Sequence, residues 1–180
     1  MSEPVIEGRG VTLRPWRGDD LSFVFHACQD RSLHRFLPLP DPYRAFDAVR
    51  FFELAASERS AGTGLHLAIT DTDTGALLGA VGAKTIGPPG GSAEIGYWLA
   101  LDGRGRGAAT AATIALAEWC LRERRLAFLD CLVAETNPAS LAVAERSGFT
   151  TVARRAGAAK DGRTSVDAIV LRRFAGPAPR

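Results

Sequence analysis

The spacing of apolar residues along the chain predicts alternating strands and helices. Runs with apolar residues at about every second position predict strands at 11–14, 65–70, 77–83, 93–101 and 128–134. Apolar residues three and four positions apart predict helices at 47–60 and 108–124, and a further helix that begins at Asp19 or Asp20. Asn137, Pro138 and Gly148 occupy the preferred start and stop positions of one more helix.

The connections between these elements predict a mixed sheet. The Asp-Thr-Gly turn at 73–75 favours a hairpin between the second and third of the strands. A helix crosses between the last two, and a helical crossover is typical of parallel neighbours. Segments 150–154 and 164–174 are expected to form a closing antiparallel hairpin across 158–163. Three prolines within 37–43 exclude a helix and predict an extended loop.

Bulk properties limit the class of protein. The 180 residues predict a single domain, with a core at about 9–174 and a disordered tail at 175–180. A net charge of +2, from 22 basic and 20 acidic residues, argues against a nucleic-acid partner. The sequence predicts no membrane span and no signal peptide, and therefore a cytoplasmic protein. Scattered cysteines and histidines predict buried free thiols and no metal site: Cys28, Cys120, Cys131, His26, His34 and His66.

Three glycines alternate with two arginines directly before the alanine-rich helix, in the segment Leu99–Thr110. Glycine can adopt φ > 0 and lets a ligand approach the backbone, so Gly103, Gly105 and Gly107 favour a tight turn with accessible N–H groups. The first N–H groups of a helix that begins near Ala108 have no helical partner, and the helix dipole is positive there. A phosphate or pyrophosphate is the expected ligand, and both arginines add positive charge. A glycine-rich turn with solvated arginines is the alternative.

Two other phosphate-binding loops fit this segment less well. A Walker loop ends in Gly-Lys-Ser/Thr, and the segment has no lysine. A dinucleotide fingerprint fits Gly103, Gly105 and Ala108, and Asp130 follows at about the expected distance, ~20 residues further on. Only residues 131–180 remain after Asp130, however, and these are too few for the other strand-helix units of a doubly wound sheet.

Three motifs together resemble the GCN5-related N-acetyltransferases, the GNAT superfamily. Residues 104–109 resemble its R/Q-x-x-G-x-G/A signature, and Asn137–Phe149 resembles its N-x-x-S…(K/R)-x-G-F segment. Val11–Asp20 is similar to the opening of the RimJ/RimL-type branch, which acetylates N-terminal amines of ribosomal proteins. The resemblance extends over about 11–174. It implies a mixed α/β fold: a mostly antiparallel sheet with a splayed pair of parallel strands, flanked by helices.

The resemblance also implies acetyl-CoA as cosubstrate and assigns residues to it. The glycine-arginine loop would hold the pyrophosphate, and the pantetheine arm would pair with the strand edge at 97–99 and with Asn137. A backbone N–H near Leu99 would face the thioester oxygen. The predicted cofactor-binding residues are Tyr97, Trp98, Leu99, Arg104, Gly105, Arg106, Gly107, Ala108, Ala109, Thr110 and Asn137.

Two residues are the catalytic candidates. Glu94 corresponds to a glutamate that some relatives use as the general base, often through a water molecule; an exposed strand residue is the alternative. Ser140 lies where RimJ/RimL relatives place a hydroxyl that can protonate the thiolate; a capping or packing serine is the alternative. Other family members use a later tyrosine as the acid, but Tyr43 and Tyr97 are the only tyrosines here, which favours Ser140.

The sequence therefore predicts an acetyl-CoA-dependent N-acetyltransferase that acts on a primary amine. The acceptor is either a protein N-terminus or a small amine, such as an aminoglycoside, a polyamine or an amino-acid derivative. A non-catalytic acyl-CoA-binding protein is the third alternative. The oligomeric state is left open, with a homodimer among the alternatives.

Overall fold

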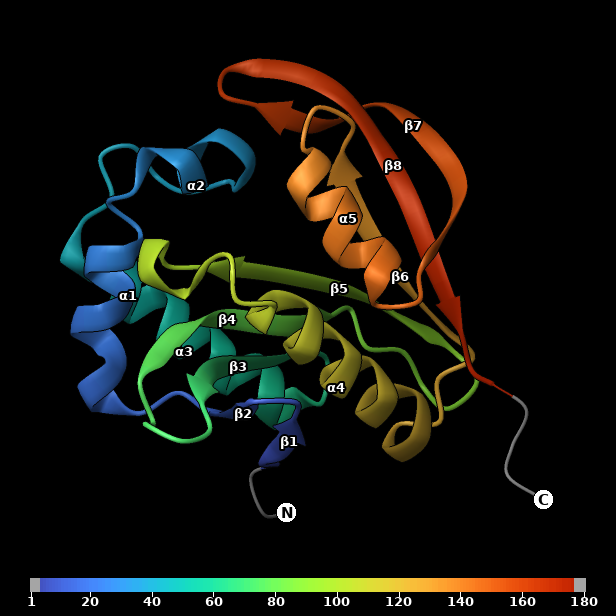
Figure 1. The fold of residues 1–180 in the computed structure, drawn as a ribbon, viewed down its shortest axis with the longest axis horizontal. Helices are drawn as coiled ribbons and strands as arrows, with labels where there is room; N and C mark the ends of the chain where they lie inside the picture. The colour runs from blue at the N-terminus through green and yellow to red at the C-terminus, as the bar shows by residue number, and fades with distance from the viewer. Residues whose placement is uncertain (1–3, 177–180) are drawn as a thin grey trace.

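The computed structural model describes residues 4–176, which form one sheet with helices on both faces (Figure 1). The strands are β1 (Ile6–Gly8), β2 (Val11–Pro15), β3 (Leu65–Asp71), β4 (Leu77–Lys84), β5 (Ser92–Leu99), β6 (Phe128–Ala134), β7 (Thr150–Asp161) and β8 (Thr164–Phe174). The helices are α1 (Leu21–Ala27), α2 (Arg31–Phe36), α3 (Ala45–Ala61), α4 (Ala108–Glu123) and α5 (Pro138–Arg146), with one-turn 3-10 helices at Gly18–Asp20 and Leu101–Gly103.

The sheet has the strand order β1-β2-β3-β4-β5-β6-β8-β7, and among the described residues β5 and β6 are its one parallel pair. These two strands pair only over 92–94 and 128–130. Beyond this point β5 continues to Leu99 beside β4, whereas β6 continues to Ala134 beside β8. The strands therefore separate toward their carboxyl ends, which confirms the predicted mixed sheet with a splayed parallel pair.

Each face of the sheet buries its own apolar cluster. Helix α4 covers one face, and its small side chains let it lie close to the strands: Ala108, Ala112, Ala115 and Ala117 are all buried. Helices α1 and α3 cover the opposite face, where Trp16, Phe51 and Phe52 pack around a smaller cluster. Figure 1 shows α4 in front of the sheet and α3 behind it. Within residues 4–176 no helix combines the length and the hydrophobicity needed to cross a membrane.

The structure corrects several local predictions. Asp20 does not cap α1; its buried carboxylate accepts hydrogen bonds from Arg14, at 2.7 and 2.9 Å, and from the Arg17 N–H at 2.8 Å. Strand β1 and helix α2 were not predicted, because three and six residues are too short to show a clear period. The last hairpin turns at 161–164 instead of 158–163, since β7 continues past a register shift between Arg155 and Ala159.

Two further predictions concern the cysteines and the end of the chain. All three cysteines are buried and free, as expected, and burial raises the pKa of Cys120 and Cys131 to about 12. Ala175, predicted to begin a disordered tail, is instead bound to the domain, because its N–H donates to the Ala127 carbonyl at 2.9 Å. Residues 177–180 lie outside the described part of the chain.

Candidate active site

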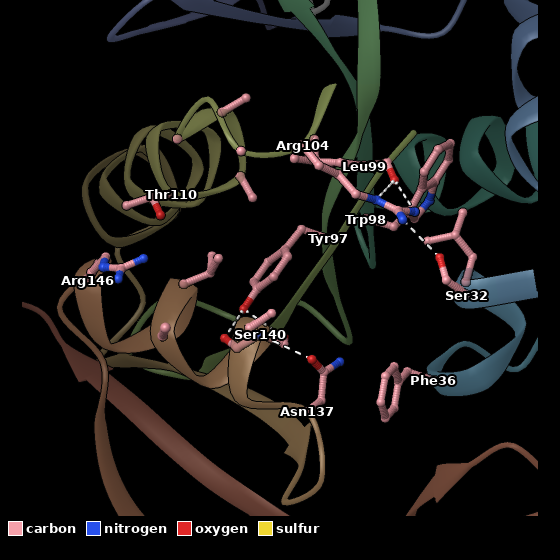
Figure 2. A pocket seen from close by; sticks show the side chains of 18 of the residues that line it. Ser32, Phe36, Tyr97, Trp98, Leu99, Arg104, Thr110, Asn137, Ser140 and Arg146 are labelled. Atoms are coloured by element: carbon pink, nitrogen blue, oxygen red, sulfur yellow. Dashed lines mark hydrogen bonds between the residues drawn. The ribbon is translucent and has the colours of Figure 1, made fainter. Parts of the chain in front are cut away.

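A cavity of about 650 Å³ lies where β5 and β6 separate. Four segments line it: α2, the end of β5, the loop that leads into α4 with the first turn of that helix, and α5. Figure 1 shows α2 and α5 on either side of the end of β5, and Figure 2 shows their side chains directed into the same space. The sheet topology therefore brings together segments that are more than 100 residues apart in sequence, from Ser32 to Arg146.

The loop before α4 has the geometry of an anion site. Gly105 and Gly107 have φ of 76° and 78°, a conformation that side chains disfavour, and apart from their chain neighbours no atom of residues 4–176 lies within 4 Å of a Cβ built on either. The first hydrogen bond of α4 runs from Ala111 N–H to the Gly107 carbonyl. Within the described residues, the six N–H groups from Gly105 to Thr110 donate to no protein acceptor. These donors and the positive end of the helix fit a pyrophosphate.

Gly103 differs from the other two glycines of the loop. Its φ is not positive, and a Cβ there would come within 2.6 Å of the Leu78 carbonyl oxygen. Gly103 is buried against the backbone of β4 and donates its N–H to the Ala100 carbonyl at 3.0 Å. Its predicted part in the anion-binding turn is therefore wrong: the glycine lets two backbone segments approach each other.

The two arginines of the loop lie in different places. Arg104 lines the cavity, and its guanidinium donates to the Leu99 carbonyl at 2.9 and 3.1 Å and to Ser32 Oγ at 2.9 Å (Figure 2). It also donates to Asp30 at 2.7 Å. Burial would raise the pKa of Asp30, but hydrogen bonds from Ser32 and Arg104 outweigh it and lower that pKa. Arg104 thus connects α2 to the end of β5. Arg106 is not among the described residues that line the cavity. Direct contact of either arginine with pyrophosphate stays a prediction.

The edge of β5 that faces the cavity carries polar backbone groups. Ala100 N–H donates to the Leu78 carbonyl on β4 at 2.9 Å. Because backbone groups point to alternate sides along a strand, those of Leu99 and Tyr97 point away from β4, toward the separated β6. The Leu99 carbonyl already accepts from Arg104. The pairing of a pantetheine arm with residues 97–99 stays a prediction and would use the Leu99 N–H and the backbone groups of Tyr97. Trp98 also lines the cavity but presents its ring to Phe23 on the other face, with ring centroids 6.3 Å apart.

Three polar side chains meet at the start of α5. Asn137 caps the helix, since its Oδ1 accepts the Ser140 N–H at 3.1 Å, and its amide nitrogen remains available to a ligand. The Tyr97 hydroxyl donates to the Ser140 carbonyl at 2.8 Å and lies 3.1 Å from Ser140 Oγ (Figure 2). Burial raises the pKa of Tyr97, so that its hydroxyl stays protonated. The tyrosine that sequence reasoning set aside as an acid thus contacts the predicted proton donor.

Glu94 lies outside this cavity. It belongs to the stretch of β5 that is still paired with β6, and its carboxylate forms an ion pair with Lys84 at 2.9 Å. Since side chains alternate along β5, Glu94 and Trp98 share the face opposite to Tyr97. Its role as the general base stays a prediction, and it would have to act through an intervening water molecule.

Sequence reasoning missed the contributions of α2 and of the end of α5. Ser32 and Phe36 line the cavity from one side, and Arg146 places a cation on the other. The signal for α2 was present: Asp30 caps it by accepting the Ser32 N–H at 2.8 Å, a typical helix start. The dinucleotide interpretation fails, because the Asp130 carboxylate pairs with Arg172 at 2.6 and 2.8 Å and the sheet is mostly antiparallel.

The comparison with protein families agrees with this geometry. The family model described as Acetyltransferase (GNAT) domain matches residues 11–150, well over half of the chain. The chain therefore belongs to the GNAT acetyltransferases. It is an enzyme of this class, with acetyl-CoA as its acetyl donor, and the resemblance seen in the sequence is confirmed. No curated protein sequence matches the chain.

Solved structures show the same fold at low sequence identity. RimL, a ribosomal L7/L12 α-N-protein acetyltransferase solved with coenzyme A, superposes with a TM-score of 0.87 at 19% identity, over 95% of this chain and 98% of that one. RimJ of Mycobacterium smegmatis superposes with a TM-score of 0.86 at 21% identity, over 99% of this chain and 89% of RimJ. Spermidine N-acetyltransferase of Vibrio cholerae superposes with a TM-score of 0.79 at 20% identity, over 92% of this chain and 96% of that one. Such identities establish a common fold and leave the acceptor undetermined.

Proposed function

We propose that this acetyltransferase modifies the α-amino group of a protein or peptide N-terminus. We call the cavity of about 650 Å³ described above the coenzyme cavity. The support is a second cavity, of about 160 Å³, on the opposite face of β5. We call it the acceptor cavity; it is lined by Leu37, Phe51, His66, Ala80, Val81, Gly82, Lys84, Gly96, Tyr97 and Trp98. Leu37, Tyr97 and Trp98 line both cavities, so a thioester and an amine can meet between them.

The charges around the acceptor cavity favour a monovalent amine. Among the described residues its lining contains no carboxylate, and the two nearby ones are already paired: Glu94 with Lys84 at 2.9 Å and Glu58 with His66 at 2.7 Å. A polyamine or an aminoglycoside carries several positive charges and would gain little from such a site. One terminal amine on a short, uncharged peptide end fits the mostly apolar walls. The likeness in fold to RimL and RimJ agrees with this acceptor.

The residues of the chain have distinct parts in the proposed reaction. The bound thioester supplies an activated acetyl group. The N–H groups from Gly105 to Thr110 hold the pyrophosphate, and the backbone at 97–99, with Asn137, aligns the arm. In the proposed reaction the Leu99 N–H stabilises negative charge on the thioester oxygen during attack. The Ser140 hydroxyl, in contact with Tyr97, gives its proton to the leaving sulfur.

An acceptor panel with thiol release as the readout tests the proposal. The panel contains a short peptide with a free α-amine, the same peptide with that amine blocked and an internal lysine left free, spermidine, an aminoglycoside and a free amino acid. Transfer to the free peptide alone is the expected result. Preference for spermidine or the aminoglycoside would contradict the proposal and indicate a small-molecule enzyme. Binding of acetyl-CoA without transfer to any amine would indicate a non-catalytic binding protein.

A further inference from the structure

His66 lines the acceptor cavity and lies in register with two glycines on the neighbouring strands. His66 on β3 pairs with Gly82 on β4, which in turn pairs with Gly96 on β5. Paired residues of neighbouring strands point to the same face, so the imidazole stands at one end of a row of two glycines. Apart from its chain neighbours, no atom of the part of the chain that the structure describes lies within 4 Å of a Cβ built on Gly96. The two glycines therefore leave no side chain between the His66 ring and β5, a span of about 10 Å or two strand spacings.

The orientation of the ring is set by a carboxylate on α3. His66 Nε2 lies 2.7 Å from Glu58 Oε2, and the histidine side chain is 14% exposed. A carboxylate only accepts, so Nε2 carries a proton, and in the neutral form of the ring the lone pair is then on Nδ1. Nδ1 faces Gly82, because a Cβ built on that glycine would come within 2.8 Å of it. Phe51 packs edge-on against the ring, with centroids 6.0 Å apart.

We propose that His66 accepts the proton of the incoming ammonium through Nδ1, with Glu58 as the positioning residue. The inference deepens the proposed function, since it assigns a proton acceptor to the cavity in which the amine would bind. It needs an amine acceptor of any kind and does not depend on that amine being a peptide terminus. A carboxylate–imidazole pair holds the tautomer that can accept a proton and stabilises the imidazolium that results.

The charged groups around His66 are consistent with this role. Glu58 approaches from α3, Lys84 lies on the neighbouring strand β4 and is paired with Glu94 of β5, and Arg14 on β2 is paired with Asp20. Glu94 precedes Gly96 by two residues on β5, so both face the same side of the sheet, and its carboxylate is already paired with Lys84. Of the two candidate bases, His66 lines the cavity and Glu94 does not.

The proton and electron balance of the step is complete. One ammonium proton moves to Nδ1, and the nitrogen lone pair attacks the thioester carbonyl carbon. The C–N bond forms, the C–S bond breaks, and its electron pair leaves with the sulfur, which takes a proton from the Ser140 hydroxyl. The second amine proton is lost as the amide forms and replaces the proton of Ser140. Solvent then removes the proton from His66, and the products are the acetylamide, the free thiol and one proton.

The test compares three glutamine variants of the full chain over a range of pH. In His66→Gln the amide can still donate to Glu58, but no group that accepts a proton remains. With the free peptide as acceptor we expect kcat/KM to fall about 100-fold at pH 6.5, because general base catalysis typically contributes about 10²–10⁴-fold. The loss should shrink above pH 8, where an α-amine with a pKa of about 7.7–8.0 is already neutral. Glu58→Gln should show a smaller loss with the same pH dependence, and Glu94→Gln should lose less than His66→Gln.

Binding and rescue measurements separate chemistry from folding. The KM for acetyl-CoA should be unchanged in His66→Gln, and His26→Gln, at an exposed histidine on α1, should behave as wild type. Added imidazole should restore part of the activity of His66→Gly. Wild-type turnover and an unchanged pH profile in His66→Gln would overturn the inference, as would a larger loss in Glu94→Gln. If the wild type modifies spermidine and not the peptide, the proposed function fails, and the same variants assayed with spermidine decide the role of His66.

Discussion

The hydroxyl of Tyr97 lies 3.1 Å from Ser140 Oγ and donates a hydrogen bond to the Ser140 carbonyl at 2.8 Å. One residue belongs to β5 and the other to α5, so this contact connects the two walls of the coenzyme cavity. Because the phenol proton is used for the carbonyl, the Ser140 hydroxyl is the donor in its contact with the phenolic oxygen. When thiolate forms, rotation about one bond can redirect that proton to the sulfur.

We predict that Ser140→Ala slows acetyl transfer without weakening the binding of acetyl-CoA. The expected loss in kcat is about 10²-fold, the lower end for general acid catalysis. Tyr97→Phe should lower kcat less, about tenfold, because it removes the hydrogen-bond partner of Ser140 and leaves the Ser140 hydroxyl, the proton donor, in place. Tyr43→Phe is the matched control, since Tyr43 is buried but contacts Cys28 and not the cavity. Full activity of Ser140→Ala would exclude the proton-donor role.

Acetyl-CoA is expected to stabilise the folded protein against heat. At a ligand concentration of about 100 times Kd, the gain is about 2.7 kcal/mol. For a chain of this size that corresponds to a rise in Tm of about 5–10 °C. Gly107→Glu should abolish the rise, since it places a carboxylate where the pyrophosphate binds and forces a side chain onto a residue with φ of 78°.

A second glycine variant separates backbone strain from lost binding. Gly10 has φ of 71°, and among the described residues other than its neighbours no atom lies within 4 Å of a built Cβ, but it lies in the turn between β1 and β2, away from the cavity. Gly10→Glu should therefore lower the Tm of the free protein as Gly107→Glu does and keep the full response to acetyl-CoA. An unchanged Tm of the wild-type protein with acetyl-CoA would contradict the pyrophosphate site itself.

Glu94 is the base that the family resemblance implies, and its contribution is predicted to be smaller than that of His66. Glu94→Gln should lower turnover mainly at low pH, where most of the acceptor amine is protonated. The expected loss is about tenfold at pH 6.5 and smaller above pH 8, in a pH profile of kcat/KM. Glu123→Gln is the control, because that carboxylate also pairs with a basic residue, Arg122, at 2.7 Å but lies at the end of α4. An equal loss at every pH would show that the pair with Lys84 has a structural function.

The position of α2 is predicted to depend on a carboxylate with a low pKa. Hydrogen bonds from Arg35 lower the pKa of Asp161 to about 2, from an ordinary value of 3.8, and Gly162 N–H donates to the Arg35 carbonyl at 2.8 Å. A lowered pKa means that this contribution to stability is complete above the ordinary value and disappears as the pH falls toward 2. Asp161→Asn should therefore lower the Tm slightly at neutral pH, and the difference should shrink as the pH falls from about 4 to 2. A difference that is as large at pH 2 as at neutral pH would show that the ion pair is not its source.

Much of the site could be predicted because its residues are neighbours in sequence. The turn that begins with Gly105 and Gly107, the unpartnered N–H groups of α4 and the cap formed by Asn137 are all local features. Their geometry follows from φ preferences and from hydrogen bonds between residues at most four positions apart. A local pattern therefore sufficed to predict a binding site for the acetyl donor and to locate the first turn of α5.

Contacts between distant segments could not be predicted in this way. Gly103 was expected to shape the turn, but it is needed because the Leu78 carbonyl lies against it. Tyr97 was set aside as an acid because acids in relatives come later in the chain, yet it lies beside Ser140, 43 residues away. His66 resembled any scattered histidine until the register of β3 with β4 placed Gly82 next to its ring.

The amino-acid sequence by itself determined the family, the order of most elements and the loop that would hold the pyrophosphate, because these depend on short-range spacing and backbone preference. The tertiary structure decided where β5 and β6 separate, which side chains meet across that gap, and that His66, paired with Glu58, lies in register with Gly82 and Gly96. Those relations depend on strand register and helix packing, which join residues that have no relation in sequence.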